Sequence, residues 1–270
     1  MVGEVAIVES ANEPGNQPIR AARSVYNFPP MGSEERWYSP RFYQELKATR
    51  ESAREILPII IALLAPTSLV DVGCGAGHWL AMASELGIGD ILGVDGPWVL
   101  KMDLAIPRDK FLVHDLSKPL SLARRFHLAL CLEVAEHLAP GQARSFVQSL
   151  CTAADWVLFS AAIPGQGGRH HVNEQWPSYW AALFAQCHYD CYDVVRQKLW
   201  NNPRVLWYYA QNCLLFARHG SASRLGEPSD PLSLVHRTLW SAQVAKMDSL
   251  GKLLEGLPKL FLNRFRSWHR

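Results

Sequence analysis

The sequence has no CxxC pair, a cysteine spacing typical of zinc and redox sites. Cys187 and Cys191 are four residues apart, but no second pair or nearby HxxxH accompanies them, so no metal site is expected. Cys74 lies in a glycine-rich turn and Cys131 in a predicted buried strand, which are poor places for a disulfide. All six cysteines are therefore expected to be reduced thiols of a cytoplasmic protein.

Long hydrophobic runs and a strong net charge are also missing. The longest apolar run, residues 56–65, contains Pro58 and reaches about half the length of a membrane span. The first ten residues are acidic, and their apolar part is too short for a signal peptide. The formal net charge is only +2, which gives no general case for nucleic-acid binding. We expect a cytoplasmic globular chain with no nucleic-acid partner.

The dinucleotide fingerprint GxGxxG is absent too, although glycines follow an apolar stretch in LVDVGCGAGHW. The glycines are Gly73, Gly75 and Gly77. A fingerprint would have its third glycine at the position of His78. Asp71 precedes the first glycine, where an acid disfavours a pyrophosphate but suits a ligand with an ammonium group. Glycines between a strand and a helix indicate that such a ligand lies close to the backbone.

Apolar strands and helical stretches alternate after an N-terminal region rich in Pro, Gly, Asn and Ser. We predict a mobile arm or lid over residues 1–40, a catalytic domain over 41–218, and a linker with a basic amphipathic C-terminal helix over 219–270. Strands are predicted at 69–72, 91–95, 111–114, 128–132 and 156–162, helices at 42–64 (interrupted near Pro58), 78–86, 141–151 and 179–187, and a closing hairpin at 189–198 and 205–217. The alternation favours a parallel sheet covered by helices on both faces.

Two more acids follow predicted strands. Asp95 ends the second strand in GVDG, where a carboxylate can accept hydrogen bonds from both hydroxyls of a ribose. Asp115 follows the third strand in VHDL, where it can accept from an adenine amino group, although it could also be a helix N-cap. An ammonium group, a ribose and an adenine without phosphates describe S-adenosylmethionine (SAM).

Four segments resemble the successive motifs of class I SAM-dependent methyltransferases, in the same order: DVGCGAGHW, GVDG, HDL and LALCLEVAEHL. The resemblance covers residues 40–217. It implies an α/β fold, a Rossmann-like seven-stranded sheet with helices on both faces and an antiparallel last strand, in agreement with the predicted hairpin. One position departs from the family pattern, because the fourth strand often begins with Asp and here has His127.

The resemblance implies that SAM is bound and that S-adenosylhomocysteine is the product. By this likeness the glycines pass under the methionine part, Asp71 holds its amino group, Asp95 binds the ribose and Asp115 the adenine. The residues assigned to the cofactor are Asp71, Gly73, Gly75, Gly77, Asp95, Asp115, Leu116 and Glu133.

The segment EVAEHL follows the fourth predicted strand, at the edge where reacting groups of open α/β sheets lie. Glu133 and Glu136 could neutralise charge on a substrate, and His137 could act as a base. The alternative is that Glu136 and His137 begin a helix, with the imidazole held by the backbone.

The segment IPGQGGRHHVNEQWPSYW follows the fifth predicted strand and is expected to lie over the methyl group. A similar HVNEQW stretch occurs in a subgroup of these enzymes associated with glycan or natural-product biosynthesis. By that likeness His171, Asn173 and Glu174 face the acceptor. His171 is the expected base, with His170 as the alternative, because methylation of a hydroxyl requires removal of its proton.

The predicted catalytic residues are therefore His171, Glu174 and His137, and the predicted acceptor-binding residues are Tyr38, His170, Asn173 and Trp176. The alternative for this loop is that it folds over itself, with Glu174 and Asn173 capping a following helix.

These features predict O-methylation of a small-molecule natural product or a sugar-containing acceptor. N-methylation of a small metabolite and a non-catalytic SAM-binding regulatory subunit are the alternatives. Three patterns of other methyltransferases are not found after the fourth strand. They are the tetrapeptide of nucleic-acid amino methyltransferases, the Pro-Cys nucleophile of cytosine-carbon methylation and the Asp/Asn cluster of catechol-type enzymes.

The C-terminal stretch from Lys252 to Arg270 has five Lys or Arg residues against one Glu, interleaved with Leu, Phe and Trp. A basic amphipathic helix can lie on an anionic membrane surface, so peripheral membrane contact is predicted. A helix packed on the domain and a homodimer contact are the alternatives.

Overall fold

The computed structural model describes residues 40–221 and 225–255, without the side chains of residues 40–46 and 250–255. The predicted N-terminal arm with Tyr38, and the basic residues after Glu255, lie outside the described residues. No helix within the described ranges is long and apolar enough to cross a membrane.

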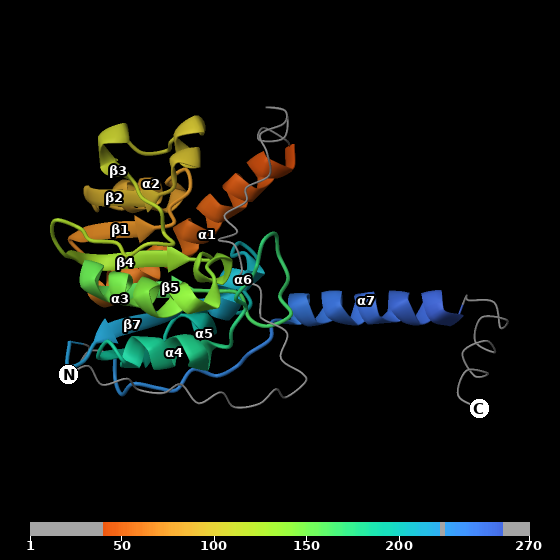
Figure 1. The fold of residues 1–270 in the computed structure, drawn as a ribbon. Helices are drawn as coiled ribbons and strands as arrows, with labels where there is room; N and C mark the ends of the chain where they lie inside the picture. Colours follow the sequence, from red (N-terminus) through yellow and green to blue (C-terminus); the bar gives the residue numbers. More distant parts are fainter. Residues whose placement is uncertain (1–39, 222–224, 256–270) are drawn as a thin grey trace, which may run out of the picture. The chain divides into compact units, whose positions relative to one another are not determined.

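Seven strands of the described residues form one sheet in the order β3-β2-β1-β4-β5-β7-β6 (Figure 1). β1 to β5 are parallel to one another, and β7 runs antiparallel to both of its neighbours, β5 and β6. The α/β fold with an antiparallel last strand is confirmed. The strands are β1 (Ser68–Val72), β2 (Asp90–Asp95), β3 (Phe111–Val113), β4 (Phe126–Leu132), β5 (Ala154–Ser160), β6 (Tyr189–Tyr192) and β7 (Leu214–Arg218).

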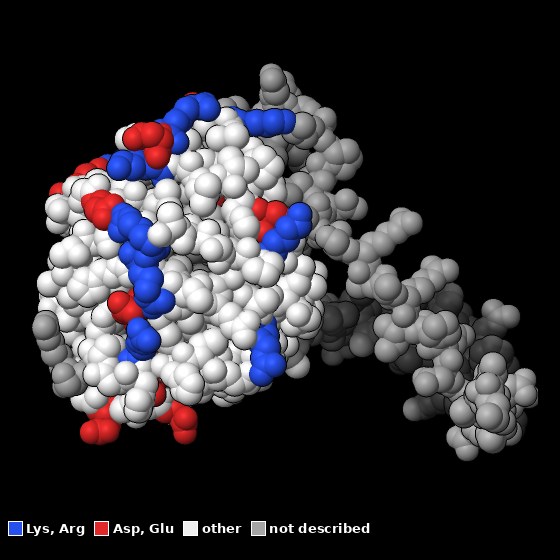
Figure 2. Space-filling view, turned by 60° about the vertical axis from the view of Figure 1, so that its left-hand side comes forward, with Lys and Arg blue, Asp and Glu red and all other residues white. Residues whose placement is uncertain are grey.

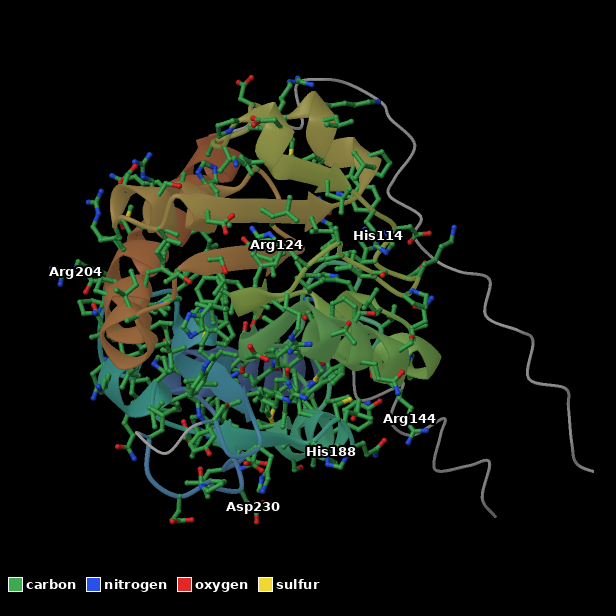
Figure 3. All side chains as sticks on the ribbon, turned by 90° about the vertical axis from the view of Figure 1, so that its left-hand side faces the viewer. His114, Arg124, Arg144, His188, Arg204 and Asp230 are labelled. Carbon is green, nitrogen blue, oxygen red and sulfur yellow. The ribbon has the colours of Figure 1, made fainter. Side chains whose placement is uncertain are left out.

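Helices cover both faces of the sheet (Figure 1). They are α1 (Pro40–Leu64), α2 (His78–Glu85), α3 (Ala143–Ala153), α4 (Pro177–Ala185), α5 (Arg196–Leu199), α6 (Trp207–Asn212) and α7 (Arg237–Glu255), with short 3₁₀ helices η2 (Pro97–Lys101), η3 (Arg108–Lys110), η4 (Ala135–His137) and η5 (Pro140–Gln142). Arg204 pairs with Glu55 of α1, and Arg144 lies at the start of α3. Figure 3 shows these two arginines on opposite sides of the sheet.

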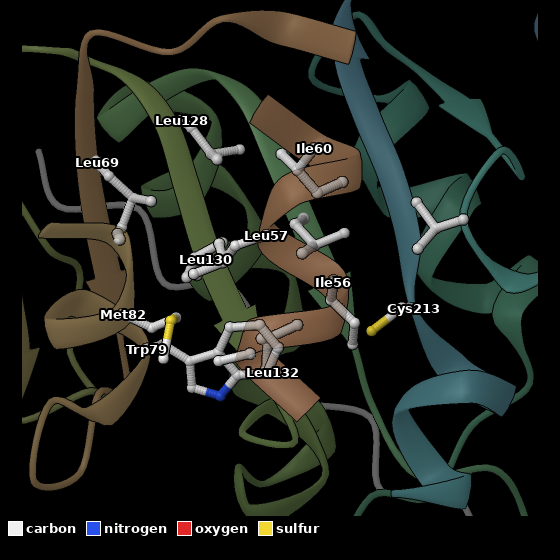
Figure 4. Close-up of a cluster of buried hydrophobic side chains, with 14 of the residues drawn as sticks. Ile56, Leu57, Ile60, Leu69, Trp79, Met82, Leu128, Leu130, Leu132 and Cys213 are labelled. Carbon is white, nitrogen blue, oxygen red and sulfur yellow. The ribbon is translucent and has the colours of Figure 1, made fainter. Parts of the chain in front are cut away.

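Alternate side chains of each strand pack into two apolar layers. Ile56, Leu57 and Ile60 of α1 are fully buried against Leu128 and Leu130 of β4, as Figure 4 shows. The other layer is aromatic, and its rings come from β5, α4 and β7. They are Phe159, Trp180, Phe184 and Phe216, with Phe184 and Phe216 stacked at 3.9 Å. Both layers hold the strand ends in fixed positions relative to one another.

Three expectations about elements need correction. α1 continues through Pro58, whose side chain is exposed, because the buried stripe on both sides of it keeps the helix on the sheet. β6 and β7 do pair in antiparallel fashion, but α5 and α6 lie between them, where a long strand and a tight turn were predicted. Tyr209 and Ala210 of α6 are buried in the α1 layer, and this burial selects helix over strand. α7 was not predicted as a helix over its actual range.

The segment after Arg218, predicted as a linker, makes specific contacts. Ser229 N–H donates to the carbonyl of Cys191, and the Leu232 carbonyl accepts from the buried guanidinium of Arg196. Leu239 in the first turn of α7 is buried, and Gln243 donates to the carbonyl of Gly165. The segment therefore runs back across the domain to the loop after β5.

Candidate active site

The carboxyl ends of β1 and β2 are joined through the side chain of Asp95. Its two carboxylate oxygens accept hydrogen bonds from the N–H groups of Gly75 (2.8 Å) and Gly96 (2.6 Å). Burial raises the pKa of Asp95, and these two donors act against that rise. A carboxylate has about four acceptor positions, so Asp95 can also accept from the hydroxyls of a ligand.

The three glycines of the turn serve different purposes. All have positive φ: 88° at Gly73, 50° at Gly75 and 83° at Gly77. A Cβ on Gly73 would lie 2.3 Å from a methyl carbon of Val134, and one on Gly77 would lie 2.9 Å from Ile106. A Cβ on Gly75 would meet nothing within 4 Å. Packing against other loops therefore requires two of the glycines, and only Gly75 faces open space.

Asp71 at the end of β1 is 3% exposed, and its Oδ2 has no hydrogen-bond partner among the described residues. Burial, and then the nearby Asp95, raise the pKa of Asp71 to about 8. Buried polar atoms are nearly always paired, and an unpaired one calls for an explanation. A cationic ligand group beside Asp71 would supply the missing partner.

The predicted adenine site lies next to Asp95, because the N–H of His114 donates to the Asp95 carbonyl at 2.8 Å. Asp115 is exposed and accepts hydrogen bonds from the backbone and hydroxyl of Ser117, which lower its pKa. Leu116 is buried beside it. No helix begins here, so Asp115 closes a local turn and is not an N-cap.

Glu133, the residue after β4, lies in a chain of buried side-chain amides. It has a φ of 56°, which is rare outside glycine, and its carboxylate accepts from Gln166 and Asn212, each at 3.0 Å. Gln211 donates to Gln166 and accepts from the N–H of His236. Burial raises the pKa of Glu133, and the amide donors oppose this. These hydrogen-bonded side chains connect the loops after β4 and β5 to α6 and to the residue before α7.

Two backbone hydrogen bonds join η4 to the loop after β5. The N–H groups of Val172 and Asn173 donate to the carbonyl of Glu136, at 2.9 and 3.0 Å. This contact brings His137 and His171 together, with ring centroids 4.9 Å apart and planes at 83°. Burial, and then His171, lower the pKa of His137.

Glu174 organises this loop. Its carboxylate accepts from the N–H groups of Gly165 (2.8 Å) and Gly167 (2.7 Å), and lies 3.0 Å from Nδ1 of His171. No side chain caps α4, so the predicted capping by Glu174 or Asn173 is absent, although the loop does fold over itself. Asn173 is buried, with its Nδ2 unpaired among the described residues.

The remaining predicted residues are less enclosed. His170 is exposed, with a φ of 63°, and contributes its carbonyl to Nδ1 of His137 at 3.3 Å. Trp176 is exposed immediately before α4. Neither side chain is shown to face an acceptor, and Tyr38 lies outside the described residues.

A protein family described as a methyltransferase domain matches residues 43–197, more than half of the chain. The chain belongs to the methyltransferase-domain family. No curated protein matches the sequence. This agrees with the resemblance to class I SAM-dependent methyltransferases inferred from the four motifs.

Several solved methyltransferase structures have similar folds. Human N-acetylserotonin methyltransferase with SAM is 17% identical, with 68% of this chain and 57% of that chain covered and a TM-score of 0.45. Magnesium protoporphyrin IX methyltransferase from Synechocystis PCC 6803 with bound S-adenosylhomocysteine is 14% identical, with coverages of 66% and 87% and a TM-score of 0.46. Small RNA methyltransferase HEN1 is 16% identical, with coverages of 63% and 26% and a TM-score of 0.44. Because their names state three different acceptors, they assign none to this methyltransferase.

Sequence reasoning missed the amides of this methyltransferase that hold Glu133. Gln166 lies in the glycine-rich loop, and Gln211 and Asn212 end α6 just before β7. Both α6 amides are almost fully buried, at 1% and 3% exposure. The sequence does contain a sign of this role, because two adjacent amides lie inside the apolar, aromatic run WYYAQNCLLF.

Proposed function

We propose that this methyltransferase transfers a methyl group from SAM to a hydroxyl oxygen of a small-molecule natural product or a sugar-containing acceptor, with His171 as the general base. The observation that carries the proposal is the His171–Glu174 contact at the carboxyl edge of the sheet. It holds one imidazole in the loop after β5, beside His137 of η4, with one ring nitrogen already engaged.

The strand ends fit the three parts of SAM. The unpaired buried oxygen of Asp71 fits its ammonium group, and the open backbone at Gly75 leaves room for the methionine part. Asp95 has acceptor capacity for ribose hydroxyls. When bound, SAM supplies an electrophilic methyl group on a sulfonium centre.

The orientation of His171 supports the base assignment. With Nδ1–H donating to Glu174, the imidazole presents Nε2 as a hydrogen-bond acceptor, and the side chain is 12% exposed. Glu174 is itself fixed by two backbone N–H groups, so the imidazole is held by a rigid partner. A positioned base of this kind contributes about 10²- to 10⁴-fold to a rate.

The surface supports a small acceptor over a nucleic acid. On the face shown in Figure 2, basic side chains form a narrow line interrupted by acidic ones. Arg124 pairs with Asp90, and Arg125 with Asp155. Arrays of Lys and Arg side chains bind a phosphate backbone, and pairing with Asp90 and Asp155 leaves Arg124 and Arg125 less available for that role.

The test supplies the protein with methyl-labelled SAM and an extract of the source cells, separated afterwards into lipid, polymeric and small soluble fractions. We expect label in a small-molecule or glycan fraction, with NMR placing the methyl group on oxygen. His171→Ala and Glu174→Ala should lower the transfer about 10²-fold or more while the SAM dissociation constant stays within about twofold.

His188→Asn is the matched control, because His188 is exposed and immediately precedes β6, at the edge of the sheet opposite the site. Unchanged turnover in both site variants would refute the assigned base. Methyl groups found on nitrogen would favour the N-methylation alternative. SAM binding with no label in any fraction would favour a non-catalytic regulatory subunit.

A further inference from the structure

Glu136 is the least explained polar residue of the site. It is completely buried, and neither carboxyl oxygen has a hydrogen-bond partner among the described residues. Its backbone carbonyl accepts from the N–H groups of Val172 and Asn173. A carboxyl group is rarely kept out of water with both oxygens unpaired, so its surroundings should offer a partner that can bind there.

Two imidazoles and the carboxyl group of Glu133 lie near this carboxyl. One ligand atom from each of Glu136, His137 and His171 lies within 4.8 Å of the other two. Small side-chain rotations could bring all three atoms to about 2.1 Å from one ion, the usual distance of N and O ligands from a first-row metal. The set comes from two segments, η4 and the loop after β5, which the Glu136 carbonyl joins.

The outer hydrogen bonds of both imidazoles fit metal ligation. Nδ1 of His171 contacts Glu174 at 3.0 Å, and Nδ1 of His137 contacts the His170 carbonyl at 3.3 Å. Each ring therefore has its Nε2 left to coordinate. Metal-binding histidines nearly always use the second nitrogen in this way, toward a carboxylate or a backbone carbonyl.

The neighbouring acid Glu133 is arranged differently. Each of its carboxylate oxygens already accepts one hydrogen bond, from Gln166 or Asn212, and Glu133 is not part of the group whose ligand atoms lie within 4.8 Å of one another. This contrast between two carboxylates three residues apart makes Glu136 the available donor.

We propose that Glu136, His137 and His171 bind one divalent first-row transition-metal ion, with its remaining positions open to water or to the acceptor. Two imidazoles and one carboxylate suit such ions, whereas Mg²⁺ prefers oxygen ligands. The proposal rests on the same site as the proposed function. An ion there would orient and polarise the acceptor oxygen, and His171 would then be a ligand in place of a base.

The test measures metal binding alone, without SAM or acceptor. The full chain is stripped with a chelator, titrated with Co²⁺, and followed by the visible absorption of the bound ion; Zn²⁺ is then added as competitor. We expect one Co²⁺ per chain with the spectrum of a site containing nitrogen ligands, and displacement by Zn²⁺. If Co²⁺ binding saturates but the visible spectrum is not that of a site with nitrogen ligands, the proposal is wrong.

Variants identify the ligands. Glu136→Gln and His171→Ala should each weaken Co²⁺ binding by at least 10²-fold, and Glu174→Gln by about 10- to 100-fold. His188→Asn, an exposed histidine elsewhere, should bind as the unchanged protein does. Equal binding by all four variants would overturn the assignment. Circular dichroism checks folding, and His137→Gln replaces any variant that does not fold.

The two proposals fail separately. If Co²⁺ does not bind but His171→Ala still abolishes methyl transfer, the metal proposal is wrong and the base assignment stands. If Co²⁺ binds as expected and transfer requires the ion, the metal site is supported and His171 is a ligand. Both readouts use the full chain.

Discussion

Asp71 is a residue whose folded environment favours the neutral acid. Burial, above all, raises its pKa to about 8, from the usual 3.8 of an aspartic acid. Between these values the unfolded chain releases a proton that the folded chain retains. The free energy of unfolding therefore falls as pH rises from about 4 to about 8, at no more than about 1.4 kcal/mol per pH unit.

Asp71→Asn should remove this pH dependence. We expect the variant to be more stable than the unchanged protein at pH 8 by about 1–3 kcal/mol, with a smaller difference at pH 5, because the amide has no proton to lose. Urea unfolding at the two pH values measures the effect. Equal differences at both values would contradict it. The same variant should bind SAM more weakly, since the ammonium partner is lost.

At the scale of elements, the glycines of the β1–α2 turn have two roles. Gly73 and Gly77 are needed for close packing against neighbouring loops, whereas Gly75 borders open space. Gly73→Ala should destabilise the protein by about 3 kcal/mol or more, because a positive φ and a contact with Val134 both oppose the methyl group. Gly75→Ala should cost only about 1–2 kcal/mol, from φ alone.

The variant with the smaller effect on stability, Gly75→Ala, should have the clearer effect on the affinity of the folded protein for SAM. Gly75→Ala adds a methyl group where the turn faces open space, so it should weaken SAM binding in a folded protein, as calorimetry would show. If Gly75→Ala binds SAM normally, the methionine part does not lie against this residue.

The same elements show what local sequence can predict. β1, the turn and α2 were predictable, because glycines, the preceding acid and the apolar strand all lie within a dozen residues. α6 was not predictable, because aromatic residues are common in strands and helices alike. Its burial against α1 favours the helix, and local sequence does not show that burial. Glu136, His137 and His171 were all predicted near the site, but their contact with one another was not, since a backbone contact between two loops creates it. Cysteine spacing could not indicate such a site.

At the scale of the whole molecule, the basic C-terminal stretch remains a prediction, as residues 256–270 lie outside the described ones. It contains four Lys or Arg residues, each contributing about 1 kcal/mol near an anionic membrane. Deletion of 256–270 should therefore greatly reduce co-sedimentation with anionic vesicles at low salt. Neutral vesicles are the control, and unchanged co-sedimentation would leave the tail a packing or dimer element.

The order of strands in the sheet has a consequence for how the protein is made. β7 lies between β5 and β6 but is the last of the three to leave the ribosome. Until it emerges, β5 has an unpaired edge and β6 has no place in the sheet. The nascent chain thus carries an exposed strand edge that could pair with other chains. Gln211 and Asn212 arrive just before β7, so completing the sheet and fixing Glu133 occur at the same moment of synthesis.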